Sequence, residues 1–286
     1  MLKAIALALT ILAFANAPTQ AQYSDNYFEV GATGGIATYS GDLGGYFSHG
    51  NLGLMAGIMA KYNLGKYLAF RGAFNWGILQ AADKNYSDSR KYRNLSFNSH
   101  VFEMGVMAEF NILGYHPRAL ESPISPYVFL GITGFYFSPY TYSATDERVS
   151  LPDQKTEGQS YSKIQMAIPM GIGLKYALNS WWGLSFEAGV RMTTTDYLDD
   201  VSGLYPNTYT SAYSDRTNEL YQNANAQTIT ELDNYLRTRS AARGDNSPRD
   251  WYLFIGVGVH YYFIDEGLAG ATRYGRSKKG CKGAGF

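Results

Sequence analysis

The last regular stretch of the chain constrains its fold more than any other feature. From Trp251 to Phe263 the residues, WYLFIGVGVHYYF, form two alternating sets. One set is wholly apolar, whereas the other contains Gly256, Gly258 and His260. This period of two is typical of a β-strand, because helical spacing would scatter both sets. Aromatic residues at both ends match the interfacial girdles of membrane barrels. The stretch therefore predicts the closing strand of an outer-membrane β-barrel.

Earlier stretches alternate in a similar way. They span residues 27–36, 52–62, 67–79, 97–112, 126–137, 163–176 and 182–194. The connections between them alternate between long and short, as external loops and periplasmic turns do in such barrels. The sequence thus predicts an all-β fold, a transmembrane antiparallel up-and-down β-barrel of about eight strands with long external loops. An even number of strands would place the N- and C-termini both in the periplasm.

The pattern also predicts which face is outside. A soluble barrel would fill its interior with the apolar face. Here the charged and glycine-rich face suits the narrow interior of a small barrel, so we expect the apolar face to contact lipid. Residues 126–137 are apolar on both faces, so their alternation does not show which side is outward. Residues 138–162 are charged and indicate a loop.

The N-terminus carries the features of an export signal. Lys3 precedes an apolar segment from Ala4 to Ala15, and two small-residue cleavage sites follow, which end at Ala17 and Ala21. These features predict a signal peptide at 1–21, an outer-membrane barrel at 22–264 and a basic periplasmic tail at 265–286. Outer-membrane lipid is then the environment of the barrel. Lys plus Arg and Asp plus Glu number 24 each, which supplies no argument for a nucleic-acid partner.

Acids and bases are equal in number on the predicted inward face. They are Glu29, Glu103, Glu109 and Glu187 against Lys61, Arg71, Lys175 and Arg191. Buried charges persist only when they are paired and hydrogen-bonded. The interior of such a small barrel is only wide enough for side chains. We therefore predict a structural ion-pair network that plugs the lumen, with a water-filled pore as the alternative.

The sequence shows no familiar catalytic or cofactor-binding spacing. Its histidines fall in separate strands and connections, at His49, His100, His116 and His260. No HExxH, CxxC or GxSxG pattern occurs, so we expect neither enzyme activity nor a cofactor. The acidic cluster of Asp196, Asp199 and Asp200 is dense enough to be a Ca²⁺ candidate. We favour a solvated acidic rim there, so no metal is predicted.

The predicted tail is basic and carries the one cysteine of the chain. Its candidate partner-binding residues are Arg273, Arg276, Lys278, Lys279, Cys281 and Lys282. A segment of this composition cannot bury a core. An unpaired cysteine in an oxidising compartment indicates a free thiol or an intermolecular disulfide. We expect the tail to bind a periplasmic partner, with a disulfide through Cys281 as one form of that contact. An unstructured stub is the alternative.

Four segments resemble a known family. They are TYSGDLGGYF at 38–47, RVSLPDQKTEGQ at 148–159, GIGLKYAL at 171–178 and RMTTTDYLDDVSGLYP at 191–206. In these segments the chain is similar to the PorG-like outer-membrane β-barrel proteins of Bacteroidetes-type type IX secretion. The resemblance implies a non-enzymatic structural component of the secretion and gliding machinery. It also implies as partners a periplasmic ring made of a lipoprotein and its partner protein, PorK and PorN, which the barrel would anchor to the outer membrane. From the residues alone, a small outer-membrane pore and a surface adhesion barrel stay open, and the insertion at 201–250 has no assigned role.

Overall fold

The computed structural model describes residues 26–45, 51–83, 95–117, 123–142, 146–155, 157–203, 244 and 249–263. The predicted signal peptide, the predicted tail and most of the insertion at 201–250 lie outside these ranges, so their assignments stay predictions. Within the described ranges, no helix is both long enough and apolar enough to cross a membrane.

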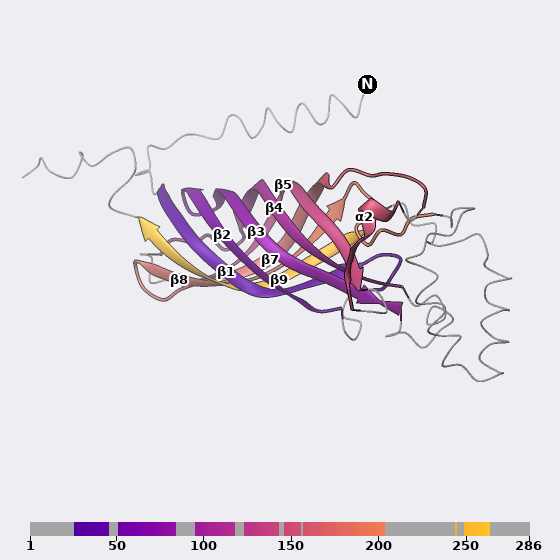
Figure 1. Ribbon diagram of the computed structural model, residues 1–286. Helices are drawn as coiled ribbons and strands as arrows, with labels where there is room; N and C mark the ends of the chain where they lie inside the picture. The colour runs from indigo at the N-terminus through magenta and orange to yellow at the C-terminus, as the bar shows by residue number, and fades with distance from the viewer. Residues whose placement is uncertain are drawn as a thin grey trace, which may run out of the picture.

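Eight antiparallel strands close into one barrel (Figure 1). They are β1 (Tyr27–Ser40), β2 (Gly53–Leu64), β3 (Leu68–Ala82), β4 (Ser96–Asn111), β5 (Ile124–Tyr142), β7 (Ile164–Ala177), β8 (Trp182–Thr193) and β9 (Trp251–Phe263). Each barrel strand pairs with the next one along the chain, and β1 pairs with β9 to close the ring. The predicted up-and-down barrel is confirmed, including the role of β9 as the closing strand.

The two ends of the barrel differ in their connections. We call one end the long-loop end, because the two longest connections, those after β5 and β8, lie there together with those after β1 and β3. The opposite, short-turn end holds the connections after β2, β4 and β7. Phe28 is opposite Phe263 in the register, so β1 begins beside the end of β9 at the short-turn end. Helix α2 lies at the long-loop end (Figure 1).

The predicted loop at 138–162 contains regular structure, which corrects that expectation. Strand β5 continues to Tyr142, and the short β6 (Arg148–Ser150) pairs with its end. Helix α2 (Leu151–Gln154) follows, with a proline in its first turn, where the missing N–H costs no helical hydrogen bond. Leu151 is buried in the mouth of the barrel and anchors this segment. One buried leucine among charged residues leaves too weak a pattern for sequence analysis to find.

The outer wall of the barrel is apolar and exposed. Ile58 is 63% exposed, Met104 73%, Ile164 70% and Ile172 65%. Along their strands these side chains alternate with inward residues that are more buried. An exposed apolar surface of this extent marks an interaction site rather than a surface that faces water. Around a closed barrel it is the band that faces lipid.

Strand β5 explains why residues 126–137 are apolar on both faces. Its even-numbered residues, such as Leu130 and Ile132, are exposed on the outer wall, whereas Phe135 and Phe137 are buried inside. The inward aromatic residues belong to a cluster that fills the long-loop half of the lumen. Its larger members also include Tyr39, Leu79, Phe97, Leu198, Tyr252 and Phe254. The lumen is therefore charged over only part of its length, which the sequence analysis did not anticipate.

Candidate functional site

Charged side chains from β1, β2, β3, β4, β7 and β8 meet inside the barrel. The set contains all the residues predicted for the lumen, Glu29, Lys61, Arg71, Glu103, Glu109, Lys175, Glu187 and Arg191, and each forms an ion pair with another member. All are buried except Glu187, whose side chain is 17% exposed. Alternation places them on the inner face, and closure of the ring brings them into contact.

Glu109 is the centre of the larger group of charges. Its carboxylate lies 2.7 Å from the Lys175 ammonium, 2.9 Å from the Lys61 ammonium and 3.2 Å from the Arg71 guanidinium. Lys61 also contacts Glu29 at 3.2 Å. A single carboxylate that faces three cations leaves an excess of positive charge, which the neighbouring carboxylates balance. This mutual pairing is what makes the buried charges tolerable.

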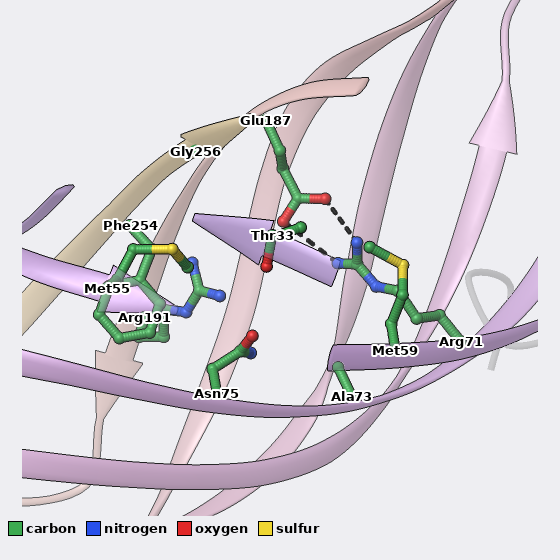
Figure 2. A pocket seen from close by; sticks show the side chains of 10 residues that line it. All are labelled: Thr33, Met55, Met59, Arg71, Ala73, Asn75, Glu187, Arg191, Phe254 and Gly256. Atoms are coloured by element: carbon green, nitrogen blue, oxygen red, sulfur yellow. Dashed lines mark hydrogen bonds and ion pairs between the residues drawn. The ribbon is translucent and has the colours of Figure 1, made fainter. Parts of the chain in front are cut away.

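Arg71 spans the lumen to reach Glu187 on the opposite wall. The two residues lie on β3 and β8, which are not neighbours in the sheet. The Tyr127 hydroxyl donates to the same carboxylate at 2.8 Å, and the guanidinium lies 4.9 Å from the centre of the Phe129 ring. Figure 2 shows Glu187 pointing toward Arg71 across the interior. Cation–π contact and ion pairing together hold the arginine in place.

A smaller group of charges lies nearer the long-loop end. The Glu103 carboxylate accepts hydrogen bonds from Arg191 at 3.1 Å, from Asn75 at 2.7 Å and from the Tyr252 hydroxyl at 2.6 Å. The Arg191 guanidinium lies 4.4 Å from the centre of the Phe254 ring. A cavity with about 20 Å³ of free space separates the two groups (Figure 2). That space holds about one water molecule.

His260 joins the larger group of charges, and the sequence analysis missed it. Its Nδ1 lies 2.8 Å from the Glu29 carboxylate, and its Nε2 lies 2.6 Å from the Ser185 hydroxyl. Two inward glycines leave space for the ring, since a Cβ on Gly31 would lie 2.7 Å from Nδ1 and one on Gly258 would lie 2.9 Å from Nε2. The contacts run from Ser185 through His260 to Glu29, which is the order of a Ser-His-acid catalytic triad. Ser185 is only 4% exposed, so these contacts hold the imidazole instead of presenting a nucleophile.

Tyrosines fill the lumen at the short-turn end. The hydroxyls of Tyr115 and Tyr262 lie 2.6 Å apart, and the Tyr27 ring packs edge-on against Tyr262. Tyr115 belongs to the connection between β4 and β5, where Gly114 adopts a φ of 74° and turns the chain back toward the barrel. A side chain that enters the lumen from a connection follows no strand period. This contact was therefore not predicted.

At the long-loop end, two members of the acidic cluster, Asp199 and Asp200, are buried. The Tyr39 hydroxyl donates to Asp199 at 2.5 Å and lies 3.0 Å from Asp250. The backbone N–H of Leu43 donates to the same Asp199 oxygen at 3.2 Å. Asp199 is 1% exposed and Asp200 0%, so these residues do not form the solvated rim that the sequence analysis favoured.

Asp250 and Asp199 share one hydroxyl, an arrangement that favours a proton on one of the two carboxyl groups. A tyrosine hydroxyl has one hydrogen to donate, and the shorter contact assigns it to Asp199. A proton on Asp250 would supply a hydrogen for the other contact. Burial, and next the negative charge of Asp199, raise the pKa of the Asp250 carboxyl well above its ordinary range.

The aspartates named as a metal candidate bind different protein donors. Asp200 accepts a hydrogen bond from the Tyr161 hydroxyl at 2.8 Å, and Asp196 accepts one from the Ser202 hydroxyl at 2.7 Å. In the part of the chain that the structure describes, no group of three or more His, Cys, Asp or Glu residues is placed to hold a metal ion. The structure thus adds no support for Ca²⁺ binding at these positions.

The remaining candidate residues are scattered. His100 lies on the outer wall, and His116 packs edge-on against Tyr27 at the short-turn end. His49 lies outside the described residues, as do the partner-binding candidates of the tail, Cys281 among them.

A closed antiparallel barrel with an apolar exterior and a buried charged lumen is a transmembrane β-barrel of the outer-membrane type. The chain belongs to the family described as a domain of unknown function, DUF6089, whose model matches residues 4–225. No curated protein matches the chain in sequence.

Several solved outer-membrane proteins have a similar fold. Neisserial surface protein A is 14% identical with a TM-score of 0.40, and the match covers 82% of this chain and 96% of that one. Ail, the attachment invasion locus protein of Yersinia pestis, is 10% identical with a TM-score of 0.38, covering 85% and 100%. OprG from Pseudomonas aeruginosa is 11% identical with a TM-score of 0.38, covering 84% and 98%. Likeness at this level carries no information about function.

Proposed function

We propose that this barrel is a non-enzymatic structural component of the type IX protein secretion and gliding machinery. In this role it anchors a periplasmic ring, made of a PorK-like lipoprotein and its PorN-like partner, to the outer membrane. The barrel provides the fixed point in the membrane, and the basic tail after β9 provides the contact with the ring. Both termini are then periplasmic, and the long-loop end faces outward.

The observation that carries this proposal is the packing of the segments that resemble the PorG-like family. Asp199, from the segment 191–206, accepts hydrogen bonds from Tyr39 and Leu43, both in the segment 38–47. These residues close the mouth of the barrel together with Leu198 and Val201. The segments that carry the resemblance therefore pack together as one folded unit and are not scattered short matches.

A further segment of the resemblance, residues 148–159, joins the same unit. Glu157, from the segment 148–159, accepts hydrogen bonds from the backbone N–H groups of Ser202 at 2.9 Å and Gly203 at 3.1 Å. Leu151 from the same segment packs in the apolar cluster beneath. A mouth built from three distant parts of the chain favours a rigid structural element over a flexible surface loop.

The filled lumen favours an anchor over a pore. A passive pore needs a continuous path of water, whereas side chains occupy this interior from the Tyr115–Tyr262 pair to the mouth. The cavity at the centre holds about one water molecule. A barrel packed along its length resists deformation, as an attachment point for a large assembly must.

Affinity purification from membranes tests the anchoring role. One strain carries the tagged full-length chain, and a second carries a chain in which residues 265–286 are replaced by a Gly-Ser linker of equal length. We expect the ring lipoprotein and its partner to purify with the first and to be lost from the second. A matched variant, Cys281→Ser, separates charge from crosslinking, because only a disulfide gives a mobility shift on non-reducing gels.

The outcomes separate two parts of the proposal. If neither ring protein purifies with the full-length chain, the anchoring role is wrong. If both purify equally with and without the tail, the barrel anchors the ring through another surface. If Cys281→Ser retains the ring, the contact depends on the basic residues and not on a disulfide.

A further inference from the structure

A row of stacked side chains crosses the outer wall and ends at an exposed arginine. The indole of Trp76 on β3 stacks with the imidazole of His100 on β4, with ring centres 6.0 Å apart and planes at 15°. His100 stacks in turn with Tyr140 on β5, at 6.2 Å and 17°. The guanidinium of Arg148 on β6 lies 3.8 Å from the centre of the Tyr140 ring. We call these four residues the aromatic strip.

The aromatic strip lies where the outer wall changes from apolar to polar. Toward the middle of the barrel, β4 continues with Phe102, and β5 continues with Ser138 and then Tyr136, which lies opposite Phe102. Phe102 and Tyr136 are each 42% exposed. Toward the long-loop end, β4 continues with Asn98, and β3 continues with Ile78 and then Gln80, which is opposite Asn98 in the register. Such a border is where lipid headgroups meet acyl chains, and where tyrosine and tryptophan gather in barrels.

His100 presents a hydrogen-bond donor on this wall. The Trp76 indole nitrogen can only donate, and it lies 3.3 Å from His100 Nδ1. Nδ1 is therefore the acceptor, which leaves Nε2 to carry the ring N–H. The stacking fixes the plane of the ring between its two aromatic neighbours. A fixed N–H donor on a lipid-facing wall fits an acceptor supplied by the membrane.

Arg148 supplies the positive charge of the aromatic strip. Its side chain is exposed, and none of the ion pairs among the described residues includes it. The guanidinium has a planar fork of donors that matches two oxygens of one phosphate group. Stacking on Tyr140 restricts the orientation of that fork.

We propose that the aromatic strip binds the phosphate-bearing headgroup of an anionic membrane lipid. The phosphate pairs with Arg148 and accepts a hydrogen bond from His100 Nε2, while the acyl chains lie on the exposed wall beside Phe102 and Tyr136. A lipid is the occupant because the strip is continuous with the lipid-facing band, and because its charge is complementary to a phosphate. The site does not depend on the proposed role in secretion.

Quenching of Trp76 fluorescence by brominated lipids tests this site. The other tryptophans are removed as Trp181→Phe, Trp182→Phe and Trp251→Phe in the full-length chain, which is reconstituted in phosphatidylcholine vesicles. Brominated phosphatidylglycerol is the anionic probe, and brominated phosphatidylcholine is the zwitterionic reference. We expect a preference for phosphatidylglycerol that Arg148→Gln lowers about tenfold, the loss expected for a charge-assisted hydrogen bond.

Two further variants identify the contact. His100→Phe keeps an aromatic ring in the stack but removes the Nε2 donor, so it should lower the preference by a smaller factor than Arg148→Gln. Lys66→Gln is the matched control, because the Lys66 ammonium lies 5.1 Å from the Tyr67 ring at the opposite end of the barrel. It should leave quenching of Trp76 unchanged. Native mass spectrometry of the chain with all its tryptophans, with and without Arg148→Gln, should show the same loss of retained phosphatidylglycerol.

Three results would overturn the proposal. The first is equal quenching by the two lipids in the parent. The second is an equal loss with Arg148→Gln and Lys66→Gln, which would mean a general effect of positive charge. The third is relief of quenching by inorganic phosphate in the buffer, which would mean that the site takes free phosphate and not a lipid.

Discussion

The Glu109 carboxylate lies 2.9 Å from the Lys61 ammonium, although the two residues come from strands that are not adjacent. Strand β3 lies between β4 and β2 in the sheet, so the contact is made across the inside of the closed ring. Both side chains are buried, and Glu109 has two further cationic partners in Arg71 and Lys175. The ion pairs of the lumen are thus a consequence of barrel closure as well as of strand register.

Removing the charge of Glu109 should destabilise the barrel strongly. Glu109→Gln leaves three buried cations with one fewer negative partner, which typically costs about 3–5 kcal/mol. Urea unfolding in lipid vesicles measures the change in the free energy of unfolding. Adding Lys175→Met should recover part of the loss, since it removes one of the cations left in excess. An effect of Glu109→Gln below about 0.5 kcal/mol would show that the network does not stabilise the fold.

The glycine beside His260 should not tolerate a methyl group. A Cβ on Gly258 would lie 2.7 Å from the Ser185 hydroxyl and 2.9 Å from His260 Nε2. Gly258→Ala should therefore cost about 1–3 kcal/mol through overpacking. Gly34→Ala is the matched control, because a Cβ there meets nothing within 4 Å. It should be neutral or slightly stabilising, as alanine is favoured over glycine in a strand. Equal effects of the two changes would argue against close packing around His260.

Asp250 should make the barrel less stable as the pH rises. Its pKa in the folded barrel is raised, by burial first and by Asp199 next, with further contributions from Asp196 and Asp42, while the Leu198 N–H opposes the shift. The folded state then retains a proton that the unfolded chain releases above roughly pH 4. The free energy of unfolding therefore falls from that pH upward until the folded pKa is reached.

The measurement is the urea midpoint as a function of pH. Asp250→Asn keeps a hydrogen-bond donor for Tyr39 without a titrating group, so the decline with pH should become shallower. Asp153→Asn is the control, because the pKa of this exposed carboxylate is lowered by Ser150 and Lys163. It should leave the decline above roughly pH 4 unchanged. A parent and an Asp250→Asn variant with parallel pH profiles would contradict a protonated Asp250.

The purified barrel should not conduct ions in planar bilayers. Tyr115→Ala removes one of the tyrosines at the short-turn end but leaves the Glu109 group and the apolar cluster in place. This variant should also stay closed. Steady single-channel steps from the unaltered chain would favour the pore alternative over the proposed anchor. Steps that appear only with Tyr115→Ala would show that the tyrosines alone seal the lumen.

Much of this architecture could be predicted because a strand's period of two is a local property. Alternation along Trp251–Phe263 shows which residues share a face, and neighbours in sequence are enough to reveal it. The inward orientation of residues such as Arg71 and Glu187 follows from the same rule. What alternation does not show is that Arg71 pairs with Glu187 across the lumen as well as with Glu109 on the adjacent strand, because that depends on how the ring closes.

Contacts made by residues of the connections could not be predicted from sequence periodicity, because these residues lie outside the strands. Tyr115 enters the lumen from a turn, and Asp199 and Asp250 meet at Tyr39 from positions 160 and 211 residues away. Strand β5, apolar on both faces, was ambiguous because the lumen contains an apolar half as well as a charged one.

The sequence by itself determined that strands cross the membrane, that the aliphatic face meets lipid and that β9 closes the barrel, since each follows from residues a few positions apart. Only the tertiary structure decided the partners of the buried charges, the room that two glycines leave for His260 and the sealing of both mouths. These depend on the separation of opposite walls and on turns that fold back over them, which are set when the ring closes.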